Sequence, residues 1–154
     1  MNPYMEQAIR LAIENVRANR GGPFAALVVR DARVIATGTN QVTTANDPTA
    51  HAEIVAIRAA CAELRSFQLD ACDLYTTCEP CPMCLGAIYW ARPRRVYFGG
   101  TAADAAAAGF DDAFIYQQAA LPPASRKIPF IPLMRDEALA AFETWKTQAG
   151  RVNY

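Results

Sequence analysis

Two short motifs with metal-ligand side chains constrain the fold of this chain most, because they lie far apart in the sequence. The first is His51-Ala52-Glu53, which holds the only histidine, and the second is Pro80-Cys81-Pro82-Met83-Cys84. Zn²⁺ prefers nitrogen and sulfur ligands in a tetrahedron, and a catalytic zinc site uses three protein ligands and leaves the fourth position to water. We therefore expect His51, Cys81 and Cys84 to bind one Zn²⁺ per subunit, in a fold that brings the two motifs together.

The residues around these ligands indicate hydrolytic chemistry. Two cysteines at positions i and i+3 of a starting helix project to the same side, and the helix N-terminus favours their thiolates. Zinc lowers the pKa of a bound water to about 7, so that hydroxide is available at neutral pH. We expect Glu53 to take the proton from this water and to deliver it to the substrate. Together, the motifs His-x-Glu and Pro-Cys-x-x-Cys form the signature of zinc-dependent nucleobase deaminases.

A structural zinc module or a redox pair without catalysis is the alternative interpretation of the cysteines. A structural zinc site needs a fourth protein ligand. Cys78 stands three residues before Cys81, so a closed site of His51 and three cysteines is formally available. Cys78 precedes Pro80, however, where the backbone is biased to the extended form before the helix begins. We therefore expect its thiol to point away from the metal and the site to stay open.

Composition and charge limit the classes of partner. The chain of 154 residues, with 53% hydrophobic and 19% charged residues, is typical of one compact domain. No apolar run approaches the ~18 residues of a membrane span, the N-terminus has no secretory apolar region, and five cysteines fit a reducing cytosol, so we expect a cytoplasmic protein without membrane partners. The 15 basic and 15 acidic residues balance, whereas nucleic-acid-binding proteins usually carry a basic excess. A small neutral substrate is favoured over nucleic acid.

The hydrophobic pattern predicts strands alternating with helices after an initial hairpin. In chain order, we expect a helix with an apolar stripe from Met5 to Val16, strands at 24–30 and 34–40, a loop at 41–49, a helix from 51 to about 65, a strand at 73–77, a helix at 81–91 and a strand at 96–98. This order gives an α/β layered domain with a mixed sheet, in which both metal-binding motifs start helices at one sheet edge.

The last third of the chain is less regular. Residues 102–108 are alanine-rich and fit a helix or close small-residue packing. Leu121-Pro122-Pro123 breaks any helix. The segment 128–133 contains two prolines, so it can be a strand only at the periphery of a sheet. Asp136 is the candidate N-cap of a final helix.

The chain resembles the cytidine deaminase-like superfamily over nearly its whole length, and within it the bacterial guanine deaminases. The similar stretches are Gly21–Phe24, Asn46–Glu53, Cys78–Pro93, Ala108–Tyr116 and the terminal Tyr154. The zinc motifs are common to the superfamily, whereas the Gly-Phe-Asp-Asp stretch ending at Asp112 and the terminal tyrosine point to guanine. The resemblance implies a three-layer α/β/α fold with a central mixed five-stranded sheet, one deaminase domain over residues 1–154, and hydrolysis of guanine to xanthine and ammonia.

The resemblance also implies which side chains contact the base. Asn40 would hydrogen-bond it, since an amide offers both donors and an acceptor. Phe24 and Trp90 would wall or stack on the flat purine, and Ala52 and Tyr154 would complete the pocket. The alternatives are plain structural roles: Asn40 as the end of a strand, the two aromatic residues as core, and the terminal residue as disordered chain.

Three acidic residues are further candidates for the site. By the resemblance, Asp112 would bond the polar edge of the substrate or relay a proton to the departing amine, unless it only caps a turn. Glu79 lies next to the ligands and could support them or merely favour the helix N-terminus. Glu143 lies in a segment that could cover the pocket, and a solvated helix face is the alternative.

Assembly and the rival functions complete these expectations. The resemblance implies a homodimer in which the C-terminal segment, residues 120–154, is exchanged between subunits, with Pro122-Pro123 as the hinge. A tRNA adenosine deaminase uses the same zinc chemistry on a flipped base, but the balanced charge and the aromatic C-terminal end argue against it. A deaminase of cytosine or another small base stays open, since the zinc and Glu53 are common to all of these enzymes.

Overall fold

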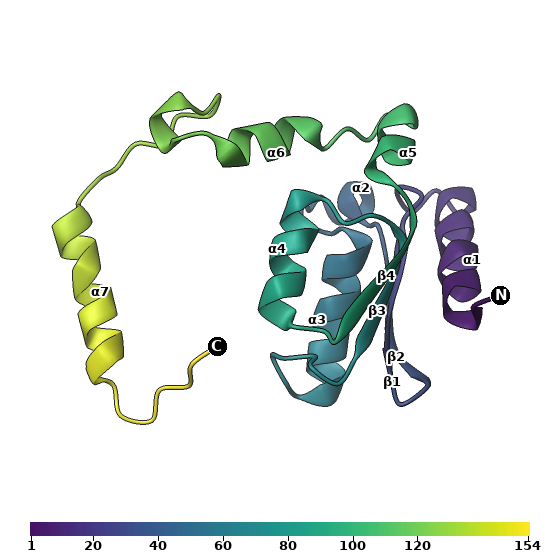
Figure 1. Ribbon diagram of the computed structural model, residues 1–154, viewed down its shortest axis with the longest axis horizontal. Coiled ribbons are helices and arrows are strands. Elements are labelled where there is room, and N and C mark those ends of the chain that lie inside the picture. Colours follow the sequence, from purple (N-terminus) through teal and green to yellow (C-terminus); the bar gives the residue numbers. More distant parts are fainter. The chain divides into compact units, whose positions relative to one another are not determined.

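The computed structural model describes residues 1–154, which form two compact units, Met1–Asp112 and Ala113–Tyr154. The first unit contains, in chain order, α1 (Pro3–Arg17), β1 (Ala25–Arg30), β2 (Arg33–Thr39), α2 (Val42–Ala45), α3 (Ala52–Leu64), β3 (Asp73–Cys78), α4 (Pro82–Ala91), β4 (Arg95–Gly100) and α5 (Ala102–Ala107). α1 lies on one face of the sheet, and α3 and α4 lie on the other (Figure 1). This is the predicted three-layer α/β/α arrangement. All helices of the chain fall short of the length and apolarity that a membrane span requires.

The sheet is mixed and has the strand order β2-β1-β3-β4. β1 pairs antiparallel with both β2 and β3, whereas β3 and β4 are parallel. The expectation of five strands within the chain is wrong, because the sheet has four and ends at β4. The segment 128–133 belongs to the second unit and lies outside any sheet, and its two prolines lack the N–H that a ladder needs.

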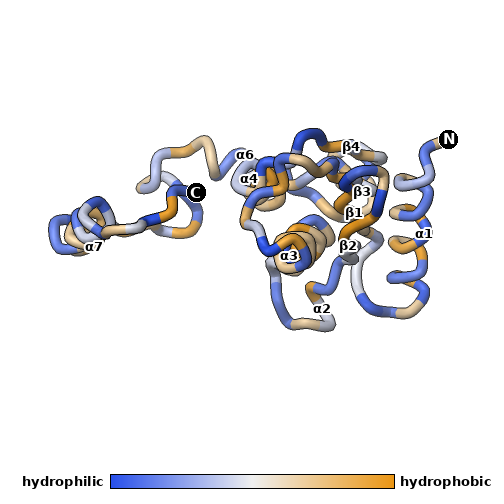
Figure 2. The backbone as a smooth tube through the Cα atoms, turned by 90° about the horizontal axis from the view of Figure 1, so that it is seen from below, coloured by the Kyte–Doolittle hydropathy of each residue, from blue (hydrophilic) through white to orange (hydrophobic).

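The first helix begins at a clear start signal. The Asn2 side chain accepts hydrogen bonds from the backbone N–H groups of Tyr4 and Met5, and proline occupies the first helical position. α1 alternates between hydrophobic and hydrophilic stretches along its length (Figure 2), and it buries Ala8, Ala12 and Asn15. It ends at Arg17, so the segment from there to the sheet is a turn that includes the Gly21-Gly22 pair.

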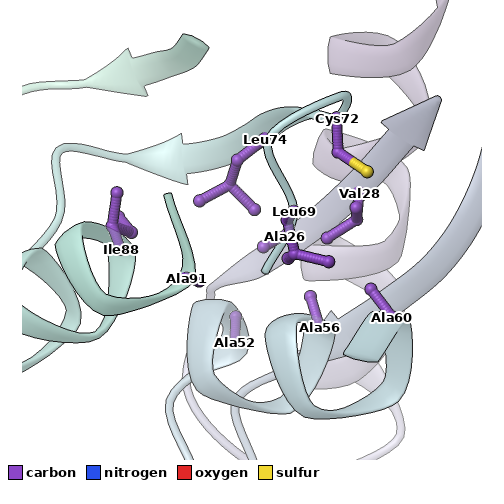
Figure 3. Close-up of a cluster of buried hydrophobic side chains, with 10 residues drawn as sticks. All are labelled: Ala26, Val28, Ala52, Ala56, Ala60, Leu69, Cys72, Leu74, Ile88 and Ala91. Atoms are coloured by element: carbon purple, nitrogen blue, oxygen red, sulfur yellow. The ribbon is translucent and has the colours of Figure 1, made fainter. Parts of the chain in front are cut away.

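The main core lies between the sheet and the pair α3 and α4 (Figure 3). α3 faces the strands with alanines, among them Ala52 and Ala56. Gly38 of β2 shows how close the helix lies, because a Cβ atom at this position would come within 2.2 Å of the Ala52 carbonyl oxygen and 2.5 Å of the Ala56 nitrogen. Small side chains on both sides therefore fix α3, and with it the His51-Ala52-Glu53 motif, against the strands.

The second unit consists of α6 (Ala113–Ala120), a short 3₁₀ helix η1 (Pro123–Ser125) and α7 (Arg135–Thr147). The predicted break at Leu121-Pro122-Pro123 is confirmed. The expectation that Asp136 caps the final helix is wrong: Met134 holds the cap position in a left-handed conformation, with φ of 51°, and Asp136 lies in the first turn. No residue of this unit is buried.

Candidate metal centre and substrate pocket

The three predicted metal ligands come from the starts of two helices. His51 is the residue before α3 and Cys81 is the residue before α4, and both have extended backbones, which turns their side chains toward the space in front of the helices. Cys84 lies in the first turn of α4, three residues after Cys81, and therefore on the same side. Because α3 and α4 pack next to each other on one sheet face, the two distant motifs meet.

The distances between the ligand atoms fit zinc. The Nδ1 atom of His51 lies 3.5 Å from the Cys81 Sγ and 3.6 Å from the Cys84 Sγ, and the three ligand atoms lie within 4.8 Å of one another. Zn–N bonds of about 2.0–2.1 Å and Zn–S bonds of about 2.3 Å at tetrahedral angles place nitrogen and sulfur roughly 3.6 Å apart. The donor set and its spacing therefore match a zinc centre with three protein ligands.

Cys78 does not join this group. Its thiol points to the backbone carbonyl of Thr101, at 3.6 Å, and burial raises its pKa. The three-ligand cluster consists of His51, Cys81 and Cys84 alone. The expectation that the Cys78 thiol points away from the other three ligand side chains is confirmed, and three protein ligands are the number that a catalytic zinc centre uses.

The cluster favours the thiolate that zinc binds. The hydrogen bond with the Cys84 thiol, together with the hydrogen bond and charge of His51, lowers the pKa of Cys81 to about 4. The same sulfur–sulfur contact, together with burial, raises the pKa of Cys84, and the hydrogen bond to Cys81 raises that of His51. One negative charge is thus already stabilised at the ligand position that begins α4.

Glu53 lies beside the ligands without being one of them. It is 6% exposed, and its carboxylate accepts hydrogen bonds from the Thr76 hydroxyl at 3.3 Å and the Cys84 thiol at 3.4 Å. Burial raises its pKa above the ordinary value. A raised pKa makes the protonated form of a carboxyl group easier to reach, which suits a group that accepts and returns a proton.

A pocket with a volume of about 470 Å³, its open mouth included, leads to this centre. All of its lining residues belong to the first unit, and they are Phe24, Asn40, His51, Ala52, Glu53, Cys78, Glu79, Cys81, Ala105, Phe110 and Asp112. The predicted residues Phe24, Asn40, Ala52 and Asp112 therefore all lie at the pocket. Asp112 is half-buried, and burial raises the pKa of its carboxyl group.

Two lining residues carry no role in the sequence-based prediction. The Phe110 ring packs edge-to-face against Phe24, with ring centroids 4.9 Å apart and planes at 83°, so the two rings form one aromatic wall. Ala105 is the buried residue of α5. The available signal for Phe110 was its place in the Gly-Phe-Asp-Asp stretch, whereas one alanine in an alanine-rich run has none.

Of the other candidates, Glu79 lies at the pocket, and Trp90, Glu143 and Tyr154 lie elsewhere in this chain. Trp90 is 63% exposed near the end of α4, outside the pocket lining. Glu79 lies at the pocket and accepts a hydrogen bond from the backbone N–H of Ala102 at the start of α5. Glu143 pairs with Lys146 at 2.6 Å in α7. Like Tyr154, it belongs to the second unit, so neither residue lines the pocket formed by the first unit.

Comparisons with known proteins agree with this geometry. Residues 1–100 match the family described as the cytidine and deoxycytidylate deaminase zinc-binding region. The guanine deaminase of Bacillus subtilis (strain 168) is 53% identical over 151 residues, which are 98% of this chain and 97% of that protein. The X-ray structure of guanine deaminase from Bacillus subtilis superposes with a TM-score of 0.96 at 52% identity and covers 100% of this chain and 99% of that one.

A second group of relatives is similar over a shorter stretch. The tRNA-specific adenosine deaminase of Agrobacterium fabrum is 52% identical over 77 residues, which are 50% of this chain and 51% of that protein. The match of residues 1–100 to the family, together with the ligand geometry of His51, Cys81 and Cys84, identifies the chain as a member of the zinc-binding cytidine and deoxycytidylate deaminase family.

Proposed function

We propose that this protein is a zinc-dependent guanine deaminase, which hydrolyses guanine to xanthine and ammonia. The observation that carries the proposal is the three-ligand cluster beside the buried Glu53, at a pocket lined by aromatic and hydrogen-bonding side chains. The guanine deaminase of Bacillus subtilis matches 98% of this chain, including the second unit, whereas the adenosine deaminase of Agrobacterium fabrum matches half of it. Guanine is therefore favoured over an adenosine in tRNA.

In the proposed reaction, His51, Cys81 and Cys84 would hold the zinc ion, which when bound lowers the pKa of a water molecule to about 7. Glu53 accepts a proton from that water and passes it to the ring nitrogen beside C2 of guanine. The Thr76 hydroxyl, which donates to Glu53 Oε1 at 3.3 Å, holds the carboxylate in place. The new C2 oxygen comes from water, and the amino group leaves as ammonia.

The departing amine needs a second proton, which the new C2 hydroxyl gives up as it becomes a carbonyl, and Asp112 is the group that we propose to relay it. Asp112 lines the same pocket as Glu53, and burial raises its pKa, so its carboxyl group can take up and release a proton more readily at neutral pH than an exposed aspartate. Asn40 and the backbone around Ala52 offer hydrogen bonds to the base, and the rings of Phe24 and Phe110 offer it an apolar wall.

Ammonia release measured side by side with guanine, adenine, cytosine and cytidine tests this function. Purified protein of verified zinc content should release ammonia from guanine and leave the other three substrates unchanged. A protein that deaminates cytosine or cytidine instead would contradict the choice of substrate. Binding of labelled tRNA at low and moderate salt separates the other rival, because tight binding that weakens steeply with salt would favour a tRNA substrate.

We also propose that two chains form a homodimer by exchange of the C-terminal segment, residues 120–154. The second unit buries none of its residues, and its α7 exposes an apolar stripe of Leu139, Phe142 and Trp145. Ordered apolar side chains of this size normally pack against another surface. The hinge is the turn at Pro122-Pro123, between α6 and η1.

The first unit offers the matching surface. A groove beside α1 is lined mainly by apolar residues, namely Ile9, Ala12, Ile13 and Val16 with Pro23, Arg17 and Thr77. β4 is an open strand at the sheet edge, and the segment 128–133 has no regular secondary structure of its own. We infer that the partner's 128–133 segment adds to this edge and that its α7 covers the groove, which would bring the partner's Tyr154 to the pocket. The same covering would enclose Glu143, which α7 itself carries.

We place the protein in the cytoplasm. All five cysteines are free thiols, and two of them are ligands that zinc binds only as thiolates. A reducing compartment keeps such groups in the required state.

A further inference from the structure

One side chain outside the pocket is buried at an apparent disadvantage. Asn15 lies in α1 and is fully buried, at 0% exposed, and its Oδ1 atom has no hydrogen-bond partner in the protein. An apolar side chain of similar size would leave no unsatisfied acceptor at this position. The buried amide therefore needs a reason beyond the packing of the helix.

Both hydrogens of the Asn15 amide are used on backbone groups of the pocket wall. Its Nδ2 atom donates to the carbonyl of Gly22 at 3.0 Å and to the carbonyl of Asn40 at 2.9 Å. Gly22 leads into Phe24, and Asn40 follows β2; both Phe24 and Asn40 line the pocket. Gly21 makes this close approach feasible, since a Cβ atom there would come within 2.1 Å of the Asn40 carbonyl oxygen. Asn15 thus ties together two separate segments of the wall.

Two further hydrogen bonds determine which end of the Asn40 amide faces the pocket. Its Oδ1 atom accepts hydrogen bonds from the backbone N–H groups of Gly22 and Val42, each at 3.3 Å. Its Nδ2 atom donates to no group of the chain. The carbonyl end is therefore held by the backbone, and the NH₂ end is the part of the amide that the pocket can use.

We propose that Asn15 is a positioning residue for base selection, which acts through Asn40. By holding the Gly22 and Asn40 carbonyls, it keeps the backbone donor of Gly22 aimed at the Asn40 Oδ1, so that the amide presents its NH₂ group to the base. Without this restraint the amide can rotate and present its carbonyl instead, because the two ends exchange donor and acceptor. A fixed donor favours a purine with a carbonyl oxygen at position 6, and disfavours an amino group there. The inference rests on the proposed guanine deamination and names what selects its substrate.

Kinetics on two purines test the proposal. Guanine and 2,6-diaminopurine carry the same 2-amino group and differ at position 6, with an oxygen in one and an amino group in the other. The unchanged enzyme should prefer guanine, and Asn15→Leu should reduce the ratio of the two kcat/KM values about tenfold, mainly through KM for guanine. Asn15→Ser, which keeps one donor, provides the same measurement if the leucine variant does not fold, with a smaller reduction expected.

Leu11→Ala is the matched control. Leu11 is half-buried in the same helix and packs against the cluster on the α1 face of the sheet, without a hydrogen bond to the pocket wall. Its truncation should lower the melting temperature and leave the ratio unchanged. A folded Asn15→Leu enzyme with the original ratio would overturn the role of Asn15 while leaving guanine deamination intact. Failure of the unchanged enzyme to deaminate guanine would overturn both.

Discussion

At the scale of single residues, the site separates the group that moves protons from the groups that bind metal. Glu53 is two residues from a ligand, yet its carboxylate contacts Thr76 and the Cys84 thiol rather than completing the cluster of His51, Cys81 and Cys84. Its burial raises its pKa, which suits a group that alternates between two protonation states. Metal binding and proton transfer can therefore be removed one at a time.

Glu53→Gln should abolish most of the turnover and keep the zinc. The amide cannot accept the proton of water, so kcat for guanine should fall roughly 10²- to 10⁴-fold, while the zinc content of the purified protein stays at one ion per chain. Glu63→Gln is the matched control, since Glu63 is exposed on the same helix and its replacement should leave kcat unchanged. Equal activity of the Glu53 variant and the control would exclude the proposed proton transfer.

The sequence predicts those site residues whose chemistry is explicit in a motif. His51, Cys81 and Cys84 were predictable because few residue types bind zinc and the spacing limits their geometry. The role that we infer for Asn15 was not predictable, since nothing in the α1 pattern shows that a polar residue among apolar ones ties two later segments together. Phe110 is part of the Gly-Phe-Asp-Asp stretch of the family resemblance, but that resemblance implied no role for its side chain. Its contact with Phe24 depends on where α5 and the following turn lie.

At the scale of elements, the position of the site depends on how closely α3 lies on the sheet. Gly38 of β2 faces the backbone of α3 at Ala52 and Ala56, next to the residues that bind metal and move protons. Helix–sheet distance and site geometry are thus coupled through one glycine. A strand and a helix can be predicted from periodicity, but the distance between them depends on such contacts.

Gly38→Ala should push α3 away from β2 and loosen the site. The new methyl group would meet backbone atoms at 2.2 and 2.5 Å, which cannot give way as side-chain ends do, so we expect a loss of about 1–3 kcal/mol in the free energy of unfolding and weaker zinc retention against a chelator. Gly86→Ala is the control, because a Cβ atom there meets nothing within 4 Å. In the helix α4 this change should stabilise the protein by about 0.5–1 kcal/mol. Chemical denaturation measures the change in the free energy of unfolding for both variants.

The ion cluster of Asp73 at the start of β3 predicts a dependence of stability on pH. Asp73 accepts paired hydrogen bonds from Arg94 and from Arg95 of β4, and these arginines, the first contributing most, lower its pKa. A carboxylate whose pKa is lower in the folded state stabilises the fold above its ordinary pKa of 3.8 and loses that contribution as the pH falls through the lowered value.

Asp73→Asn should therefore lower the melting temperature at pH 7 by roughly 2–5 °C. This difference between the two proteins should shrink as the pH falls below 3.8. Melting curves of both proteins from pH 7 down to pH 3 test this. A constant difference between the two proteins across the whole range would mean that the charge of Asp73 contributes nothing to the pairing of β3 with β4. Exposed Arg30, which pairs only with Asp31 on the surface, supplies the control Arg30→Gln, for which we expect little effect.

At the scale of the whole molecule, the sheet ends at the open strand β4, and the second unit leaves its apolar side chains exposed. The two prolines at 129 and 132 were correctly expected to limit a strand in the segment 128–133. The hydrophobic pattern predicts the four strands that the sheet contains, whereas the fifth strand was expected from the family resemblance alone.

Removal of Val152–Tyr154 tests whether the C-terminal end belongs to the site. The truncated protein should bind zinc as before, since all three ligands lie in the first unit, but its turnover of guanine should fall at least tenfold because the pocket is left open. Full activity of the truncated protein would remove Tyr154 from the proposed site.

Mixing two variants of low activity tests whether the C-terminal segment is exchanged between subunits. In a heterodimer of Glu53→Gln and the truncated chain, one site combines an intact Glu53 with the intact end of the other subunit. After random mixing, half of the dimers are mixed and one of their two sites is complete, so activity should recover to about a quarter of the original value. Two different affinity tags verify that mixed dimers form. If they form without recovery of activity, the site is not completed across the dimer.

The proline at position 129 has a consequence for how far the sheet can grow. An added strand that pairs with β4 through the N–H groups of Ile128 and Phe130 turns the nitrogen of Pro129 to its outer side, because neighbouring residues of a strand face opposite ways. Proline has no hydrogen to offer there. The next strand would find a donor missing, so the segment that closes one open edge does not create an equally good one. If two copies join by the proposed exchange, the added segment therefore also limits further pairing of sheet edges into fibrils.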